Sequence, residues 1–229
     1  MAYDFIGLVN DVNRRLNEVE LNSNNFNSAT GFYSMAKDAI NSSIRKVNQE
    51  AFEWPFNHVE QEDTLTPGQV RYAYPTDAKT IDNESYRIKR DATIGNETKR
   101  LKLISYEEYL DKYLDDEYNT DDTSLRSIPE FVFRTPNREY GVYPAPDEAY
   151  KLAYEYYSIP TDLSSATDVP TLPEQFRYLI VDGAMYHVFI FRGNTQDAGM
   201  YQQRFEEGLK DLRSIYTNRY EYLRDTRIR

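Results

Sequence analysis

The chain has 229 residues, a formal net charge of -11 and no cysteine. Its length suffices for one domain with a large insertion or for two small domains. The lack of cysteine excludes disulfides, thiolate catalysis and cysteine-ligated metals. The negative charge argues against a general nucleic-acid binder, because phosphate contact requires a positive surface. The 21 tyrosines supply large side chains with a polar tip, which suit both cores and subunit interfaces.

The first two predicted helices occupy residues 4–21 and 31–51. In each, apolar residues recur at spacings of three and four, which indicates a helix with one buried face. The loop between them is rich in asparagine and serine, which favour turns. The first apolar stripe contains Phe5, Leu8, Val9, Val12, Leu16 and Val19, and the second contains Phe32, Met35, Ala36, Ala39, Ile40, Ile44 and Val47.

After residue 51 the hydrophobic period changes to two, which is typical of strands. We expect a block of antiparallel hairpins over residues 52–169, inserted between helical flanks. Within it, residues 106–116 form a short helix, and an acidic, solvated loop covers residues 111–123. The predicted strands lie at residues 70–74, 84–90, 98–104, 130–134, 139–143 and 151–157.

Two further helices are expected over residues 176–191 and 196–216. Nearly every residue of the first is apolar, and a helix that is apolar all round is buried on all sides. Its polar exceptions, Arg177, Asp182 and His187, are five residues apart and never share a face. Thr171 and Glu174 have the spacing of a capping box at the start of this helix. The second helix has one apolar and one charged face.

These patterns predict an α+β fold. Residues 1–51 and 170–216 form an antiparallel helical bundle, into which the antiparallel β domain of residues 52–169 is inserted. The last segment, residues 217–229, carries a charge of +2 and leaves -13 for the rest, which suggests a docking tail on an acidic body. The alternative is a frayed terminus. Its candidate docking residues are Tyr216, Arg219, Tyr220, Tyr222, Arg224, Arg227 and Arg229, of types enriched at interface hot spots.

No pattern of catalytic or metal-binding residues stands out. His58 and His187 are the only histidines and lack clustered partners, so we expect structural roles for both. The acidic loop lacks the central glycine and closing glutamate of a calcium loop. We therefore expect no enzyme, no catalytic residues, no cofactor and no metal. A carboxylate pair for hydrolysis, or a sugar-binding aromatic platform around Trp54, is the alternative.

Three segments resemble the head-to-tail adaptor proteins of tailed bacteriophages, a family that includes the tail tubular protein A of short-tailed phages. The first is INSSIRKVNQEAFEWPFN, at residues 40–57. The second is YGVYPAPDEAYKLAYEYYSIPTDL, which is similar to a strand pair and connector of that family. The third is PEQFRYLIVDGAMYHVFIFRGN, followed by QQRFEEGLKDLRSIYTNRYEY. For residues 82–128 no resemblance is recognised.

The resemblance implies a structural adaptor that forms a ring, usually of twelve copies, and extends the DNA channel for genome retention and ejection. The implied partners are the portal protein, a tail nozzle protein similar to tail tubular protein B, tail fibres and further copies of the chain. DNA passes through without specific binding. The implied location is the head–tail junction of the virion, after synthesis in the host cytoplasm. Another connector or tail-completion ring is the alternative.

Such a ring would give the all-apolar helix a second partner. One side can pack in its own subunit and the other against a neighbour, as a head-to-tail ring contact requires. The candidate interface residues are Phe176, Leu179, Ile180, Met185, Val188 and Phe191. The tail is implied to reach the portal. No apolar run is long enough for a membrane span, and no signal peptide is recognisable, so we expect a soluble, intracellular protein.

Overall fold

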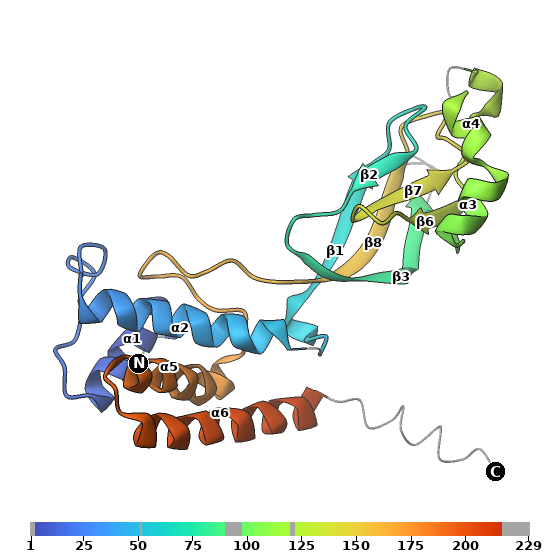
Figure 1. Ribbon diagram of the computed structural model, residues 1–229. Helices are drawn as coiled ribbons and strands as arrows, with labels where there is room; N and C mark the ends of the chain where they lie inside the picture. The colour runs from blue at the N-terminus through green and yellow to red at the C-terminus, as the bar shows by residue number, and fades with distance from the viewer. Residues whose placement is uncertain (1–2, 51, 90–97, 120–121, 217–229) are drawn as a thin grey trace, which may run out of the picture. The chain divides into compact units, whose positions relative to one another are not determined.

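The computed structural model describes residues 3–50, 52–89, 98–119 and 122–216 (Figure 1). The chain divides into two compact units. The helical unit combines Met1–Asn57 with Ile159–Arg229, and the β-rich unit comprises His58–Ser158. Helices and mainly antiparallel sheets together give the predicted α+β fold, with a β-rich segment inserted between helical flanks.

Four α-helices form the described part of the helical unit, and each lies where the apolar spacing predicts it. They are α1 (Phe5–Arg15), α2 (Phe32–Gln49), α5 (Arg177–Phe191) and α6 (Thr195–Tyr216). Helix α5 packs against α1, α2 and α6, which explains why it is apolar all round. Helix α1 ends well before residue 21, because Asn17 adopts a positive φ of 56° that cannot continue a helix.

The start of α5 differs from the prediction. Thr171 and Glu174 form no capping box, because the Thr171 hydroxyl lies 3.0 Å from Oδ1 of Asn57 instead. A 3₁₀ turn over Glu174–Phe176 leads into α5, and no side chain caps either element. The segment before this turn is therefore held by a hydrogen bond to a residue distant in sequence, and not by a local capping motif.

Trp54 anchors the end of the α2 segment in the helical core. Its side chain is 1% exposed, and its indole Nε1 donates to the carbonyl oxygen of Val47 at 2.9 Å. The rings of Phe52 and Phe56 lie 4.6 Å and 5.6 Å from the Trp54 ring. A buried, hydrogen-bonded indole is a structural anchor, so it offers no platform for a sugar.

The β-rich unit contains two four-stranded sheets. Sheet A has the order β1 (His58–Thr64), β8 (Lys151–Ser158), β3 (Ala78–Lys89), β4 (Thr98–Arg100), and sheet B has the order β2 (Arg71–Ala73), β7 (Glu139–Tyr143), β6 (Phe131–Arg134), β5 (Lys102–Leu103). Their inner faces bury one shared core, to which sheet A contributes Tyr86 and Tyr154 and sheet B contributes Val132 and Tyr140. The helices α3 (Tyr106–Lys112) and α4 (Leu114–Tyr118) lie on the other face of sheet B (Figure 1).

Sheet B departs from a series of antiparallel hairpins in two places. Strand β2 pairs with β7, which does not follow it in the chain. Strands β5 and β6 are parallel, with Lys102 opposite Phe131. A parallel pair requires a long crossover connection, and here that connection contains α3 and α4. In sheet A, β8 lies between β1 and β3. The last strand of the unit in sequence therefore pairs with two of its early strands.

Candidate functional site

Carboxylates of α4 point into the β-rich unit. Glu117 accepts hydrogen bonds from Nε and Nη2 of Arg71, at 2.7 Å and 2.8 Å, and from the hydroxyl of Tyr109 at 2.8 Å. The hydroxyl of Tyr143 donates to Asp116 at 2.7 Å. Burial alone would raise the pKa of Glu117, but the hydrogen bonds from Arg71 and Tyr109 outweigh it and lower this pKa below its ordinary value.

The acidic loop predicted over residues 111–123 is therefore replaced, in its described part, by the helix α4 and a 3₁₀ turn at Thr123–Leu125. The prediction misjudged this segment because inward-facing carboxylates with distant partners look the same in sequence as solvated ones. Among the described residues, no group of three or more histidines, aspartates or glutamates is placed to hold a metal ion.

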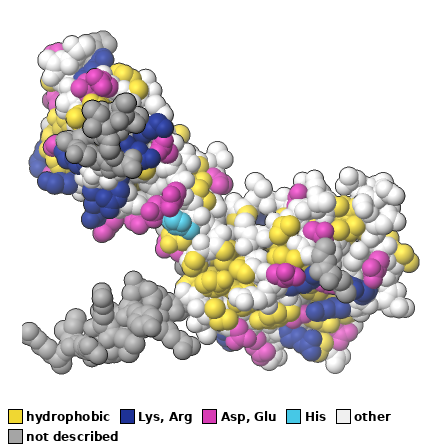
Figure 2. Space-filling view, turned by 180° about the vertical axis from the view of Figure 1, so that it is seen from behind, with side chains coloured by type: hydrophobic (Ala, Val, Ile, Leu, Met, Phe, Trp, Pro, Cys, Tyr) yellow, Lys and Arg dark blue, Asp and Glu magenta, His cyan; other side chains and the backbone are white. Residues whose placement is uncertain are grey.

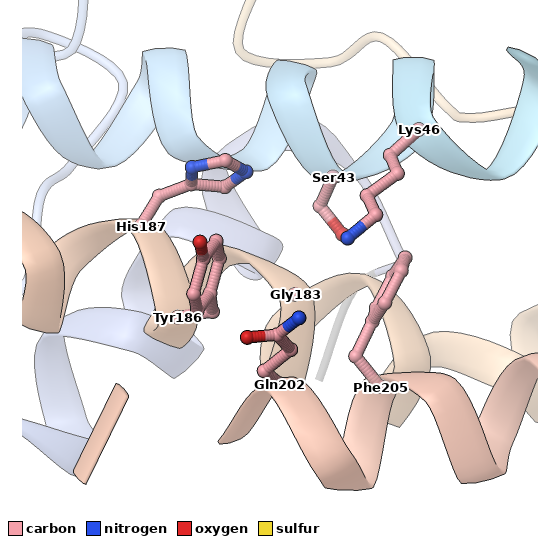
Figure 3. Close-up of a pocket in the computed structure, with 7 residues that line it drawn as sticks. All are labelled: Ser43, Lys46, Gly183, Tyr186, His187, Gln202 and Phe205. Carbon is pink, nitrogen blue, oxygen red and sulfur yellow. The ribbon is translucent and has the colours of Figure 1, made fainter. Parts of the chain in front are cut away.

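The two histidines belong to different units. His58 has its Nε2 atom 3.0 Å from Oε2 of Glu155 on the neighbouring strand. His187 is half-buried in α5, where burial and then the nearby Lys46 lower its pKa. It lines a pocket among α2, α5 and α6 of about 10 Å³, together with Ser43, Lys46, Gly183, Tyr186, Gln202 and Phe205 (Figure 3). That volume admits about one water molecule, so the pocket holds no substrate.

An arginine-lined hollow of about 450 Å³ lies between α1 and α5. Two of its guanidinium groups pair with carboxylates of the opposite helix, Arg15 with Asp182 and Arg177 with Asp11. Asp182 is 8% exposed, and a buried carboxylate needs such a partner. The ion pairs explain two of the three polar interruptions of the apolar helix, Arg177 and Asp182, and join α1 to α5.

The six candidate interface residues fall into two classes. Five lie in the core of the helical unit and are at most 3% exposed: Phe176, Leu179, Ile180, Met185 and Val188. Phe191, at the end of α5, is 67% exposed, and its neighbour Ile190 is 49% exposed. Most of α5 is thus enclosed by helices of its own unit, and contact of this set with a neighbouring copy stays a prediction. We call Ile190, Phe191 and the 45% exposed Met200 of α6 the α5–α6 corner.

Of the predicted portal-docking residues, only Tyr216 belongs to the described chain. It ends α6, and its ring lies 5.8 Å from that of Phe56 and 6.1 Å from that of Phe176. Tyr216 therefore helps to fix the end of α6 on the helical unit. The others, Arg219, Tyr220, Tyr222, Arg224, Arg227 and Arg229, lie outside the described residues.

Comparison with known proteins gives these surfaces a context. No described helix is both long and apolar enough to cross a membrane. No curated protein matches the chain. The family model of the SU10 adaptor protein, however, matches residues 3–229, which is nearly the whole chain. The predicted resemblance to phage adaptors is confirmed: the chain belongs to the SU10 adaptor protein family and has the structural role of a phage adaptor, a virion component that contacts other head and tail proteins.

Proposed function

We propose that this adaptor forms a ring of twelve copies between the portal and the tail nozzle, and that the ring extends the DNA channel. The observation that carries the proposal is the match to the adaptor family over nearly the whole chain. In this arrangement the helical parts, residues 1–51 and 170–216, face the portal. The β-rich part, residues 52–169, faces the nozzle and the tail fibres.

The charge of the chain supports a channel role. Residues 1–216 carry -13 and residues 217–229 carry +2. A negative wall repels phosphates, so DNA can slide past without adhering. A short tail in which tyrosines alternate with arginines suits docking on the portal, because these residue types dominate interface hot spots.

The tail assignment can be tested with the portal protein of the same phage. Full-length chain and a chain that ends at Tyr216 are mixed with purified portal rings, and bound protein is measured by sedimentation. A matched control keeps the length and the tyrosines but changes Arg219, Arg224, Arg227 and Arg229 to Gln. The proposal expects the full-length chain to bind, and both the truncation and the Gln variant to lose most binding. Equal binding of the truncated chain would rule out the docking role.

The ring contact on the helical unit has its own test. Phe191 is 67% exposed and its neighbour Ile190 is 49% exposed, and adjacent exposed apolar side chains suit a contact with another protein. We expect Phe191→Asp to reduce ring formation on the portal. Val169→Asp is the matched control, because Val169 is also an exposed apolar residue of the same unit, at 60%. If both variants assemble like the wild type, the α5–α6 corner is not a subunit contact.

A further inference from the structure

The outer face of sheet A has its positive charges gathered at one end. In the strand register, Arg87 lies directly opposite Arg100, and Lys89 lies directly opposite Lys151. Like charges placed directly opposite each other in a sheet are destabilising. We call these four residues the basic patch. All four are exposed, and Figure 2 shows Lys and Arg side chains gathered on this unit.

Neighbouring carboxylates offset the patch only in part. Glu62 accepts hydrogen bonds from Lys151 at 2.6 Å and from Lys89, and these bonds lower its pKa to about 2. Glu84 lies 3.0 Å from Nη2 of Arg100. Four cations against two carboxylates leave a positive surface on a chain whose net charge is -11. An anionic partner would remove the remaining repulsion.

The opposite side of the same unit is acidic. The segment from Tyr106 to Tyr118 contains six carboxylates and one lysine. Asp116 and Glu117 point inward, as described above, whereas the remaining aspartates and Glu107 stay at the surface. We call the exposed residues Glu107, Asp111 and Asp115 the acidic face.

The layers of the β-rich unit keep these two surfaces apart. The ring of Tyr109 on α3 stacks 3.7 Å from that of Phe133, which lies on the outer side of sheet B. The next residue, Val132, points to the other side, into the core shared with sheet A. The order is therefore acidic face, α3 and α4, sheet B, core, sheet A and basic patch. Figure 1 shows α3 and α4 beside β6 and β7 of sheet B.

We propose that the basic patch of one copy binds the acidic face of the next copy around the ring. The inference rests on the proposed ring function and adds the contact between β-rich units. Opposite charges on opposite sides of one subunit give a head-to-tail contact, which repeats from copy to copy and closes into a ring. Charge complementarity mainly sets register and association rate. This contact therefore aligns neighbouring copies and speeds their association.

A second copy is a better occupant of the patch than DNA. The row of residues next to the patch in sheet A is acidic, because Glu60, Glu155 and Asp82 lie opposite one another on β1, β8 and β3. These carboxylates would repel a phosphate backbone that follows the sheet. A protein surface whose acidic side chains lie in one small area can contact the basic patch without approaching these carboxylates.

Charge reversal tests the contact within a homo-oligomer. Arg87→Glu with Arg100→Glu reverses two of the four charges of the basic patch and keeps a like-charged pair directly opposite. It also replaces the Arg100–Glu84 ion pair by a repulsive contact, so the fold of this variant needs its own check. Glu107→Lys with Asp111→Lys reverses the acidic face on one side of α3. The variant with all four changes again presents complementary surfaces, with the signs exchanged. Arg204→Glu with Lys210→Glu, on the exposed face of α6, controls for the change in net charge.

Assembly on portal rings is measured by mass photometry at several protein and salt concentrations. We expect each reversal to raise the protein concentration needed for half-assembly by about tenfold, the fourfold variant to restore assembly, and added salt to weaken the wild-type ring. Thermal melting of the free chains shows that each variant is folded. The milder pair Arg87→Gln with Arg100→Gln replaces any reversal that unfolds.

The outcomes separate the inference from the function on which it rests. If the wild type forms no ring with the portal, the proposed function falls and the contact with it. If the wild type assembles and both reversals assemble equally well, only the contact is overturned. Loss of duplex DNA binding in the Gln pair with unchanged assembly would overturn it as well, and would assign the patch to DNA.

Discussion

The two units of this adaptor are stabilised by different kinds of core. The helical unit buries aliphatic residues and phenylalanines, whose packing has little directional preference. The β-rich unit buries tyrosines, and their hydroxyl groups require partners. Tyr140 and Tyr154 both donate to Asp63, at 2.7 Å and 3.1 Å, and the hydroxyls of Tyr74 and Tyr86 lie 2.8 Å apart.

The two units therefore allow the contribution of apolar packing to be compared with that of buried hydrogen bonds within one chain. The stability of the helical core depends mainly on filled volume, whereas the tyrosine core also depends on a partner for each buried hydroxyl. Burial raises the pKa of Tyr86 and Tyr140, so these hydroxyls stay neutral donors at all ordinary pH values. The following substitutions test the comparison, and hydrogen exchange measured by mass spectrometry reports on each unit separately.

Loss of volume in the helical core should have the largest effect. Leu179 is fully buried, so Leu179→Ala should reduce the free energy of unfolding of the helical unit by about 2–5 kcal/mol. Exchange in α2 and α5 should accelerate, and exchange in sheets A and B should not. Ile190→Ala, at a 49% exposed site on the same helix, should change little. Equal effects of the two variants would contradict the core assignment.

Added volume in the β-rich unit comes next. A Cβ atom on Gly141 would lie 2.1 Å from the ring of Phe133, and that ring stacks on α3. Gly141→Ala should therefore cost about 1–3 kcal/mol and accelerate exchange in β6, β7 and α3. Gly199→Ala is the matched control in the helical unit, because its Cβ meets nothing within 4 Å. It should stabilise α6 by about 0.5–1 kcal/mol.

The Glu117 network should make the β-rich unit sensitive to acid. The pKa of Glu117 is lower in the folded chain than in the unfolded one. Its contribution is therefore fully present above the unfolded pKa of about 4.5 and is lost as the pH falls through the lowered value. Glu117→Gln should cost about 1–3 kcal/mol at pH 7.

Urea unfolding at pH 7 and pH 3 measures this dependence. The wild type should lose more stability between the two values than Glu117→Gln does. Glu108→Gln, which changes an exposed carboxylate paired with Lys112 at 2.7 Å, should keep the wild-type dependence. An unchanged pH dependence in Glu117→Gln would show that other carboxylates dominate.

Removal of one tyrosine hydroxyl should have the smallest effect. Tyr140→Phe removes one donor to Asp63 but leaves the donor from Tyr154, so the expected cost is about 0.5–1.5 kcal/mol. Tyr118→Phe, at a 79% exposed position, should be neutral. A cost above that of Gly141→Ala would mean that hydroxyl satisfaction matters more than packing in this core.

Local patterns predicted most of the elements. Alternation located β7 at Glu139–Tyr143 and β8 at Lys151–Ser158. Three-and-four spacing located α1, α2 and α6, and a continuous apolar run located α5. The prediction missed the parallel pairing of β5 and β6, because pairing between strands so far apart leaves no local signal. It placed the end of the helical segment at residue 116 and not at Tyr118. It also treated the α4 carboxylates as solvated, because their inward direction becomes intelligible only with Arg71, 46 residues away from Glu117.

The functional surfaces were less predictable than the fold. The apolar run of α5 packs against three helices of its own unit. Sequence cannot distinguish burial within a unit from burial between subunits, so the contact of α5 with a neighbouring copy stays a prediction. Arg87 and Arg100 were not recognised as a pair, because the strand register that places them opposite each other is a property of the folded sheet. The adaptor role itself could be predicted from resemblance, although not from any catalytic or binding motif.

The insertion of the β-rich unit has a consequence for the order of synthesis. Backbone amides of Phe5 and Ile6 donate to the carbonyl oxygens of Asp168 and Ala166, and α2 packs on α5. The ribosome therefore delivers α1 and α2 more than a hundred residues before their partners. The β-rich segment is synthesised in full, and can fold, before α1 and α2 have their packing partners. The helical unit can close only after α5 and α6 have been synthesised.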